Sequence, residues 1–124
     1  MIKFDHMNLP VTDPRSSRDW YVSHFGFRVE FEVPERETVA LIDDGGFTIF
    51  LYRTPAQLAG VRPALTLQVD DVDEKAEELE AAGVKLAVRP QANQWGYGAE
   101  LDDLDGYRLM LWDERTMREK SSIS

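Results

Sequence analysis

Apolar and polar residues alternate over residues 4–11, a pattern that predicts a half-buried β-strand. Asp13-Pro14 then has the composition of a helix start, and Gly26 that of a helix end. Three more alternating stretches predict strands at residues 27–33, 38–42 and 47–53. The first half of the chain therefore predicts the order β-α-β-β-β.

The same order returns after a connector over residues 54–63. An alternating stretch from Ala64 to Val69 is followed by a helix that Asp71 caps and Gly83 ends. Three short strands are predicted at residues 84–88, 97–101 and 107–112. Beyond Asp113 the chain is polar, and we expect this tail to fray.

Corresponding residues in the two halves indicate an internal repeat. Val11 and Asp13 match Val69 and Asp71, and the helix and hairpin glycines recur in the same order. The prediction is an α+β fold of two tandem βαβββ modules in a single domain over residues 1–124. Its parts are module 1 at about 3–53, the connector at 54–63, module 2 at about 64–113 and a flexible tail at 114–124. Each helix covers only one sheet face, so the opposite, concave face must contact the sister module, a partner chain or a ligand.

Several short motifs resemble the vicinal-oxygen-chelate (VOC) superfamily, which includes glyoxalases, bleomycin-resistance proteins and extradiol dioxygenases. They are Asp5-His6-Met7-Asn8-Leu9-Pro10-Val11, Phe25-Gly26-Phe27, Val69-Asp70-Asp71-Val72 and Asp103-Leu104-Asp105-Gly106-Tyr107. The likeness covers about residues 3–114, and Leu104 stands where the family usually has proline. The resemblance implies the glyoxalase/bleomycin resistance/dihydroxybiphenyl dioxygenase fold, with curved mixed sheets around a cavity and usually a homodimer.

The resemblance also implies four metal-ligand positions, one on the first and last strand of each module. His6 matches the first, but Phe50, Ala64 and Met110 occupy the others. A phenyl ring and a methyl group have no donor atoms, and a thioether is a poor ligand for Zn²⁺ or Mn²⁺. The residues that remain nearby are Gln68, Thr66 and Glu100, and the facing of Glu100 is open. We therefore expect no metal and no other cofactor.

The aliphatic residues that face the helix fix the phase of each predicted strand, because side chains alternate along it. The opposite face then combines aromatic rings with a few polar groups. The predicted ligand-binding residues are His6, Asn8, Phe50, Tyr52, Gln68, Trp95, Tyr97, Arg108, Met110 and Trp112, with Trp95 and Tyr97 at the flank of the set. This composition is typical of a pocket for an organic ligand. It equally fits a buried interface between modules or chains, in which case the protein has no ligand of its own.

The charge and the absence of cysteine limit the classes of partner. The sequence has 14 basic and 23 acidic residues, a net charge of −9, which disfavours nucleic-acid and membrane binding. Without cysteine there are no disulfides, thiolate metal sites or cysteine nucleophiles. Neither a signal peptide nor a long apolar run is visible, so a cytoplasmic location is expected. The acidic excess either solvates the surface or attracts a cationic ligand to an aromatic cleft.

Two functions remain open. The first is a metal-free protein that sequesters an aromatic or cationic small molecule, such as a bleomycin-type antibiotic. The resemblance favours it, because the family's resistance proteins are acidic, metal-free dimers that sequester drug. The alternative is a divalent-metal enzyme that uses His6, either a glyoxalase-like lyase or isomerase or an extradiol-type dioxygenase.

Overall fold

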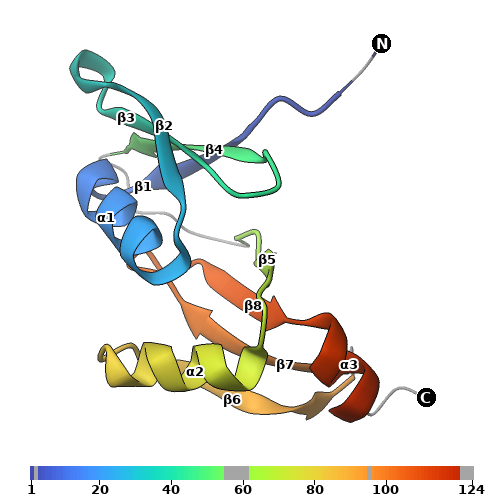
Figure 1. The fold of residues 1–124 in the computed structure, drawn as a ribbon. Helices are drawn as coiled ribbons and strands as arrows, with labels where there is room; N and C mark the ends of the chain where they lie inside the picture. The colour runs from blue at the N-terminus through green and yellow to red at the C-terminus, as the bar shows by residue number, and fades with distance from the viewer. Residues whose placement is uncertain (2, 55–61, 95, 121–124) are drawn as a thin grey trace. The chain divides into compact units, whose positions relative to one another are not determined.

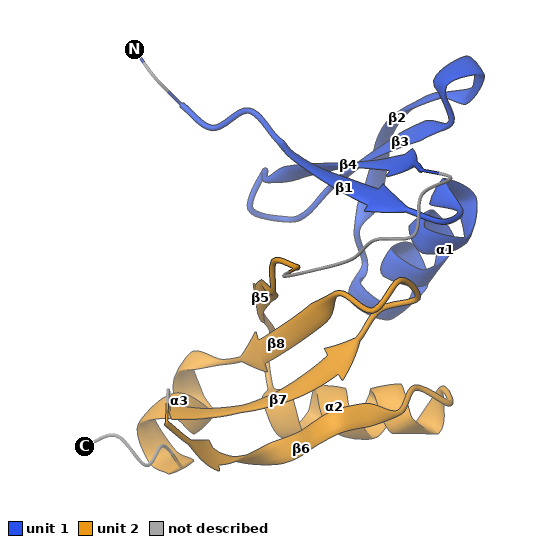
Figure 2. Ribbon diagram, turned by 180° about the vertical axis from the view of Figure 1, so that it is seen from behind, with its two compact units in different colours: residues 1–60 blue, residues 61–124 orange. Residues whose placement is uncertain are grey.

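The computed structural model of the chain describes residues 1, 3–54, 62–94 and 96–120. The chain divides into two compact units, residues 1–60 and 61–124 (Figure 2). The boundary falls inside the predicted connector at residues 54–63. That the two units form a single domain stays a prediction.

Unit 1 has a four-stranded mixed sheet with one helix on it (Figure 1). Its elements are β1 (Met7–Val11), α1 (Pro14–Phe25), β2 (Arg28–Val33), the short 3₁₀ helix η1 (Pro34–Arg36), β3 (Thr38–Ile42) and β4 (Thr48–Arg53). The strand order is β1-β4-β3-β2, in which β1 runs parallel to β4 and the other pairs are antiparallel. β1 and β4, the first and last strands of the unit in sequence, are thus neighbours in the sheet. The helix α1 packs against β2, β3 and β4.

The helix α1 begins after Asp13 and ends before Gly26, as the sequence predicts. The Asp13 carboxylate accepts hydrogen bonds from the amide of Arg15 at 3.1 Å and the hydroxyl of Ser16 at 2.8 Å. At the other end Gly26 adopts a left-handed conformation with φ of 68°, which a residue with a side chain adopts only at a cost. Between these ends α1 covers one side of the sheet. The buried apolar residues of unit 1 are Leu9, Val11, Tyr21, Phe27, Val39, Ala40, Leu41, Ile49 and Leu51.

Unit 2 repeats this topology. Its elements are β5 (Leu65–Gln68), α2 (Val72–Ala81), β6 (Leu86–Asn93), β7 (Gly96–Asp102), β8 (Arg108–Trp112) and α3 (Glu114–Lys120). The strand order is β5-β8-β7-β6, with β5 parallel to β8. This confirms the predicted α+β fold of two βαβββ modules. The predicted strand at 84–88 extends further, to Asn93, because β6 continues to pair with β7 beyond a bulge.

The tail differs from the prediction, because residues 114–120 form α3 instead of a frayed segment. The cause is Asp113, whose side chain is 1% exposed. One carboxylate oxygen accepts from the amide of Thr116 at 2.6 Å, which caps α3. The other accepts from the amide of Val72 at 2.5 Å, at the first turn of α2. Residues 121–124 of the predicted tail lie outside the described residues.

None of the helices in the described ranges is long and apolar enough to cross a membrane.

Candidate functional site

Each sheet has one face under its helix and an opposite face that no helix of the same unit covers among the described residues; we call the latter the open face. The cross-strand register decides which residues share it, because side chains alternate along a strand. In unit 1 these are Asn8, Pro10, Phe31, Val33, Thr38, Ala40, Ile42, Thr48, Phe50 and Tyr52. In unit 2 they include Thr66, Gln68, Glu100, Asp102, Arg108, Met110 and Trp112.

Aromatic rings dominate the open face of unit 1. The imidazole of His6, just before β1, stacks on the ring of Phe50 with 3.7 Å between centroids and 11° between planes. The ring of Phe31 meets Phe50 edge-on at 5.4 Å. Phe31 is 42% exposed and Tyr52 36%. The structure therefore brings His6, Phe50 and Tyr52 to one face, with Asn8 paired to Phe50 across the strands.

Phe31 was not among the predicted site residues. It lies on β2, whose alternation is clear in the sequence, but the sequence does not show which strand β2 pairs with. The register places Phe31 against Ala40 of β3, and Ala40 against Phe50 of β4. The small Ala40 side chain between them allows the two rings to meet.

The residues of unit 1 do not fit a metal ion. The Phe50 ring occupies the position at which the resemblance expects a carboxylate, and the His6 ring covers it. The Nδ1 atom of His6 lies 2.8 Å from Oδ2 of Asp5, whose side chain is 83% exposed. Within the described ranges, no group of three or more His, Asp or Glu side chains could hold a metal ion. One imidazole with one exposed carboxylate leaves a chelate incomplete.

The open face of unit 2 carries a charged cluster beside its apolar residues. Arg108 donates from Nη1 to Oε1 of Glu100 at 2.8 Å and from Nε to Oδ1 of Asp102 at 2.7 Å. These hydrogen bonds, that of Glu100 first, raise the pKa of the Arg108 guanidinium. Gln68 pairs with Trp112 across β5 and β8. Arg108, Met110, Trp112 and Gln68 thus share one face, as predicted for their strands.

Asp102 was not among the predicted residues, and Glu100 was named only as a nearby carboxylate whose facing was open. They reach the open face because β7 pairs with β8 in a register that puts Glu100 opposite Met110 and Asp102 opposite Arg108. Arg108 is six or more positions from both acidic residues in the sequence. The register brings them together, and the hydrogen bonds show that they contact one another. Among the described residues of the open face of unit 2, no aromatic pair is in contact, in contrast to His6 and Phe50 in unit 1.

Tyr97 differs from its predicted place at the flank of the open face. It lies on β7 in phase with Ala99 and Leu101, so its side chain projects to the helix-covered side and is 8% exposed. Its hydroxyl donates to Oδ1 of Asp73 on α2 at 2.6 Å, and Nζ of Lys120 lies 5.6 Å from its ring centroid. Burial, together with the bond to Asp73, raises the pKa of Tyr97 to about 12. Trp95 lies outside the described residues, and the role of the predicted set in ligand binding stays a prediction.

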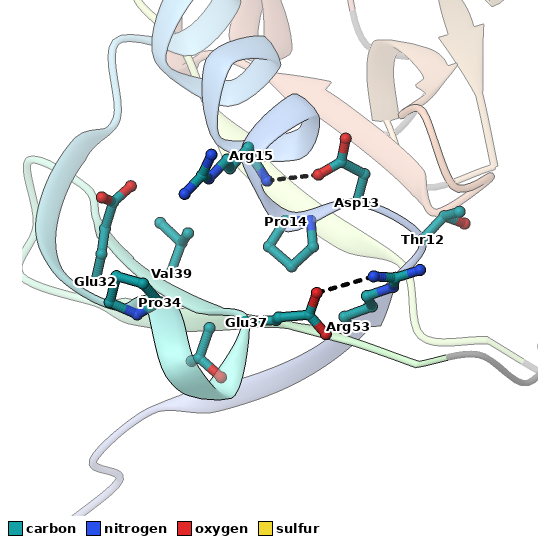
Figure 3. Close-up of a pocket in the computed structure, with 10 residues that line it drawn as sticks. Thr12, Asp13, Pro14, Arg15, Glu32, Pro34, Glu37, Val39 and Arg53 are labelled. Atoms are coloured by element: carbon teal, nitrogen blue, oxygen red, sulfur yellow. Dashed lines mark hydrogen bonds and ion pairs between the residues drawn. The ribbon is translucent and has the colours of Figure 1, made fainter.

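A separate cavity of about 550 Å³ opens in unit 1 beside the start of α1 (Figure 3). It is lined by Thr12, Asp13, Pro14, Arg15, Glu32, Pro34, Glu37, Thr38, Val39 and Arg53. Glu37 pairs with Arg53 at 2.8 Å, and Glu32 with Arg18 at 2.5 Å. The pKa of Asp13 is lowered, chiefly by the Ser16 hydroxyl that donates to it. These carboxylates are thus engaged in ion pairs and a helix cap, and none of the predicted ligand-binding residues lines the cavity.

Comparison with known proteins identifies the family. The sequence model of the Glyoxalase/Bleomycin resistance protein/Dioxygenase superfamily matches residues 3–111. TioX from Micromonospora sp. ML1 is 30% identical, with a TM-score of 0.66 over 87% of this chain and 97% of that chain. TnmS3, an antibiotic binding protein from Streptomyces sp. CB03234, is 26% identical, with a TM-score of 0.74 over 91% of this chain and 98% of that chain.

A superfamily member from Sphaerobacter thermophilus DSM 20745 is also 26% identical, with a TM-score of 0.73 and coverage of 91% and 98%. A search of curated proteins gave no match. The family match spans nearly the whole chain and agrees with the repeated βαβββ topology of the two units. The chain therefore belongs to the glyoxalase/bleomycin resistance protein/dioxygenase superfamily.

Proposed function

We propose that this protein is a metal-free small-molecule-binding protein that sequesters an aromatic or cationic compound, such as a bleomycin-type antibiotic. The observation that carries the proposal is the His6–Phe50 stack with Phe31 at its edge. It provides flat apolar surface where a catalytic metal centre would need oxygen or nitrogen donors. Binding through rings and a few polar groups is the usual chemistry of organic-ligand sites.

One relative supports the antibiotic class of ligand. TnmS3 is described as an antibiotic binding protein, and it shares the fold over nearly its full length. A role of the present chain in antibiotic resistance would follow if it withdraws such a compound from its target. Sequestration needs affinity but no reaction, which suits a site without an assembled acid–base pair or chelate.

A second candidate is a metal-dependent lyase, isomerase or dioxygenase. The contact between His6 and Asp5 favours it, because a carboxylate can orient an imidazole for metal binding or proton transfer. The exposure of Asp5 and the phenyl ring at residue 50 weigh against it. The geometry therefore ranks this activity below sequestration.

We also propose that the chain acts as a homodimer in the cytoplasm. In each unit alone, one sheet face lacks a helix, and exposed rings such as Phe31 and Tyr52 need cover. Sedimentation equilibrium checks this part: we expect a mass of twice 14.2 kDa, and a monomer at micromolar concentration would contradict it.

The main test titrates the intrinsic tryptophan fluorescence with bleomycin and with flat aromatic cations. The protein is purified without chelators, and its metal content is measured by elemental analysis. We expect a saturable change with at least one compound, metal far below one ion per chain, and binding that is weakened but not abolished in His6→Ala, because Phe50 and Phe31 keep their rings. Near-stoichiometric metal, with turnover that His6→Ala abolishes, would establish the enzyme instead. No response to any compound would mean that the open faces serve assembly alone.

A further inference from the structure

Glu100 stands at the centre of the open face of unit 2. The β7–β8 register puts it opposite Met110, so Arg108 and Trp112 are its two diagonal neighbours on the same face. Diagonal neighbours in a sheet lie about 7–8 Å apart, within reach of long side chains and of a ligand ring between them. On the Arg108 side, Glu100 and Arg108 form an ion pair with 2.8 Å between Oε1 and Nη1. On the Trp112 side no hydrogen bond or ion pair is formed within the described residues.

We infer that Glu100 is the specificity-determining residue that selects aromatic cations. Its carboxylate offsets the positive charge of a flat ring that stacks on Trp112. The inference rests on the proposed function and narrows it. It assigns the selection of a positively charged ligand to one residue of the open face. A ring placed on Trp112 would gain cation–π attraction from the indole and Coulomb attraction from the carboxylate.

The charge balance of the cluster supports a cation over an anion. Arg108 is bound by two carboxylates, Glu100 and Asp102, so the three side chains together carry one negative charge. An anionic group approaching Arg108 would have to displace one of these carboxylates or stay beside both. A cation meets neither obstacle. Arg108 therefore holds Glu100 in place and does not serve as a receptor for anions.

Burial distinguishes Glu100 from Asp102. The Glu100 side chain is 20% exposed and that of Asp102 48%, and Asp102 is the last residue of β7. Water and salt screen an exposed charge more than a partly buried one. In addition, only Oε1 of Glu100 contacts Arg108, and Oε2 has no hydrogen-bond partner within the described residues. The second oxygen is thus free to face a ligand, since a carboxylate has several acceptor positions.

The test compares N-methylacridinium with acridine, which has the same ring system and is uncharged at pH 8. Dissociation constants are measured for the full chain by fluorescence titration. We expect the wild type to bind the cation about 10-fold more tightly than acridine. Glu100→Gln keeps an oxygen for Arg108 and removes the charge, and should reduce this preference to about 2-fold or less. If that variant does not fold, Glu100→Thr, with a strand-favouring side chain, serves the same purpose.

The matched control is Asp102→Asn, which removes one negative charge from the same cluster. It should keep the preference for the cation within about 2-fold of the wild type, since the Asp102 charge is more exposed. Equal binding of both probes to the wild type would overturn the inference and leave the proposed function standing. An equal loss of the preference for the cation in Glu100→Gln and Asp102→Asn would also overturn the inference. The preference would then come from the net charge of the cluster and not from Glu100 itself. Failure of the wild type to bind either acridine or bleomycin would overturn the proposed function, and this inference with it.

Discussion

The phenyl ring of Phe50 illustrates how one side chain decides what a site can hold. It lies at a position where the family resemblance expects a carboxylate, and the His6 imidazole is stacked on it at 3.7 Å. Such a ring pair contributes about 0.5–1.5 kcal/mol beyond the area it buries. A metal at this point would gain one imidazole and lose the stack. The phenyl ring therefore disfavours a metal ion at this position.

Trp112 provides the sharpest prediction at the residue scale. If its indole stacks on the ligand, Trp112→Ala should weaken binding of an aromatic cation by about 1–3 kcal/mol. Isothermal titration calorimetry measures the change, and Trp112→Phe, which keeps a ring, should retain most of the affinity. Unchanged affinity together with loss of the dimer would show that the indole packs an interface.

At the scale of elements, Asp113 joins two helices of unit 2. Its two oxygens accept from Val72 of α2 and Thr116 of α3, and its side chain is buried. Asp113→Ala would leave both amides without this partner, so we expect a loss of about 2–4 kcal/mol in the free energy of unfolding. Urea denaturation followed by circular dichroism measures it. Asp44→Ala, in an exposed turn, should leave the midpoint nearly unchanged, and an equal shift in both variants would contradict the role of Asp113.

The attachment of α3 also predicts a pH dependence. Burial acts to raise the pKa of Asp73, but hydrogen bonds from Lys120 at 2.5 Å and Tyr97 at 2.6 Å outweigh it and lower the pKa below its ordinary 3.8. A carboxyl with a lowered pKa in the folded state stabilises the fold above its ordinary pKa, and this contribution is lost as the pH falls through the lowered value. Asp73→Asn should therefore make stability less dependent on pH between about 5 and 2.

This prediction is checked by urea denaturation at several pH values, with Asp44→Asn as the control that keeps the wild-type dependence. The same slope in wild type and Asp73→Asn would show that Asp73 does not fasten α3. Because Asp71 also binds a residue of α3, Arg115 at 2.5 Å, the variant should reduce the slope and not remove it. Deletion of α3 would remove the parts that Lys120 and Arg115 contribute, whereas the hydrogen bonds from Tyr97 to Asp73 and from the Glu74 amide to Asp71 would remain.

At the scale of the whole chain, the internal repeat was visible in the sequence because its signals are local. A helix cap at Asp13 or Asp71, a glycine at the end of a helix and strict alternation in a strand each depend on neighbouring residues. Their order is the same in both halves, and both units have the same strand order. The strand phase was also local, which is why most predicted residues lie on the open face of their own unit.

Other features depend on contacts between residues far apart in the chain. The prediction placed Tyr97 at the flank of the site, but Tyr97 projects to the helix-covered side, where its hydroxyl donates to Asp73 of α2. The polar segment after residue 113 offered few apolar residues, and only the buried carboxylate of Asp113 and the ion pairs of Arg115 and Lys120 show why it forms a helix. The cavity beside α1 is lined by residues from the start of α1, from β2, η1 and β3, and from the end of β4, and it had no sequence signal.

The sequence by itself determined the βαβββ repeat and the strand phase, since both follow from residue type and short-range periodicity. The lack of suitable donors at three of the four metal-ligand positions is what the family resemblance implied. Only the tertiary structure decided the exact strand register, which includes an irregularity in β2, because packing across the sheet contributes to the register together with the local turns. Through that register Phe31 contacts Phe50, and Glu100 and Asp102 bind Arg108. The aromatic and polar composition of the open faces thus follows from the sequence, and the charge balance of the open face of unit 2 follows from the pairing of its strands.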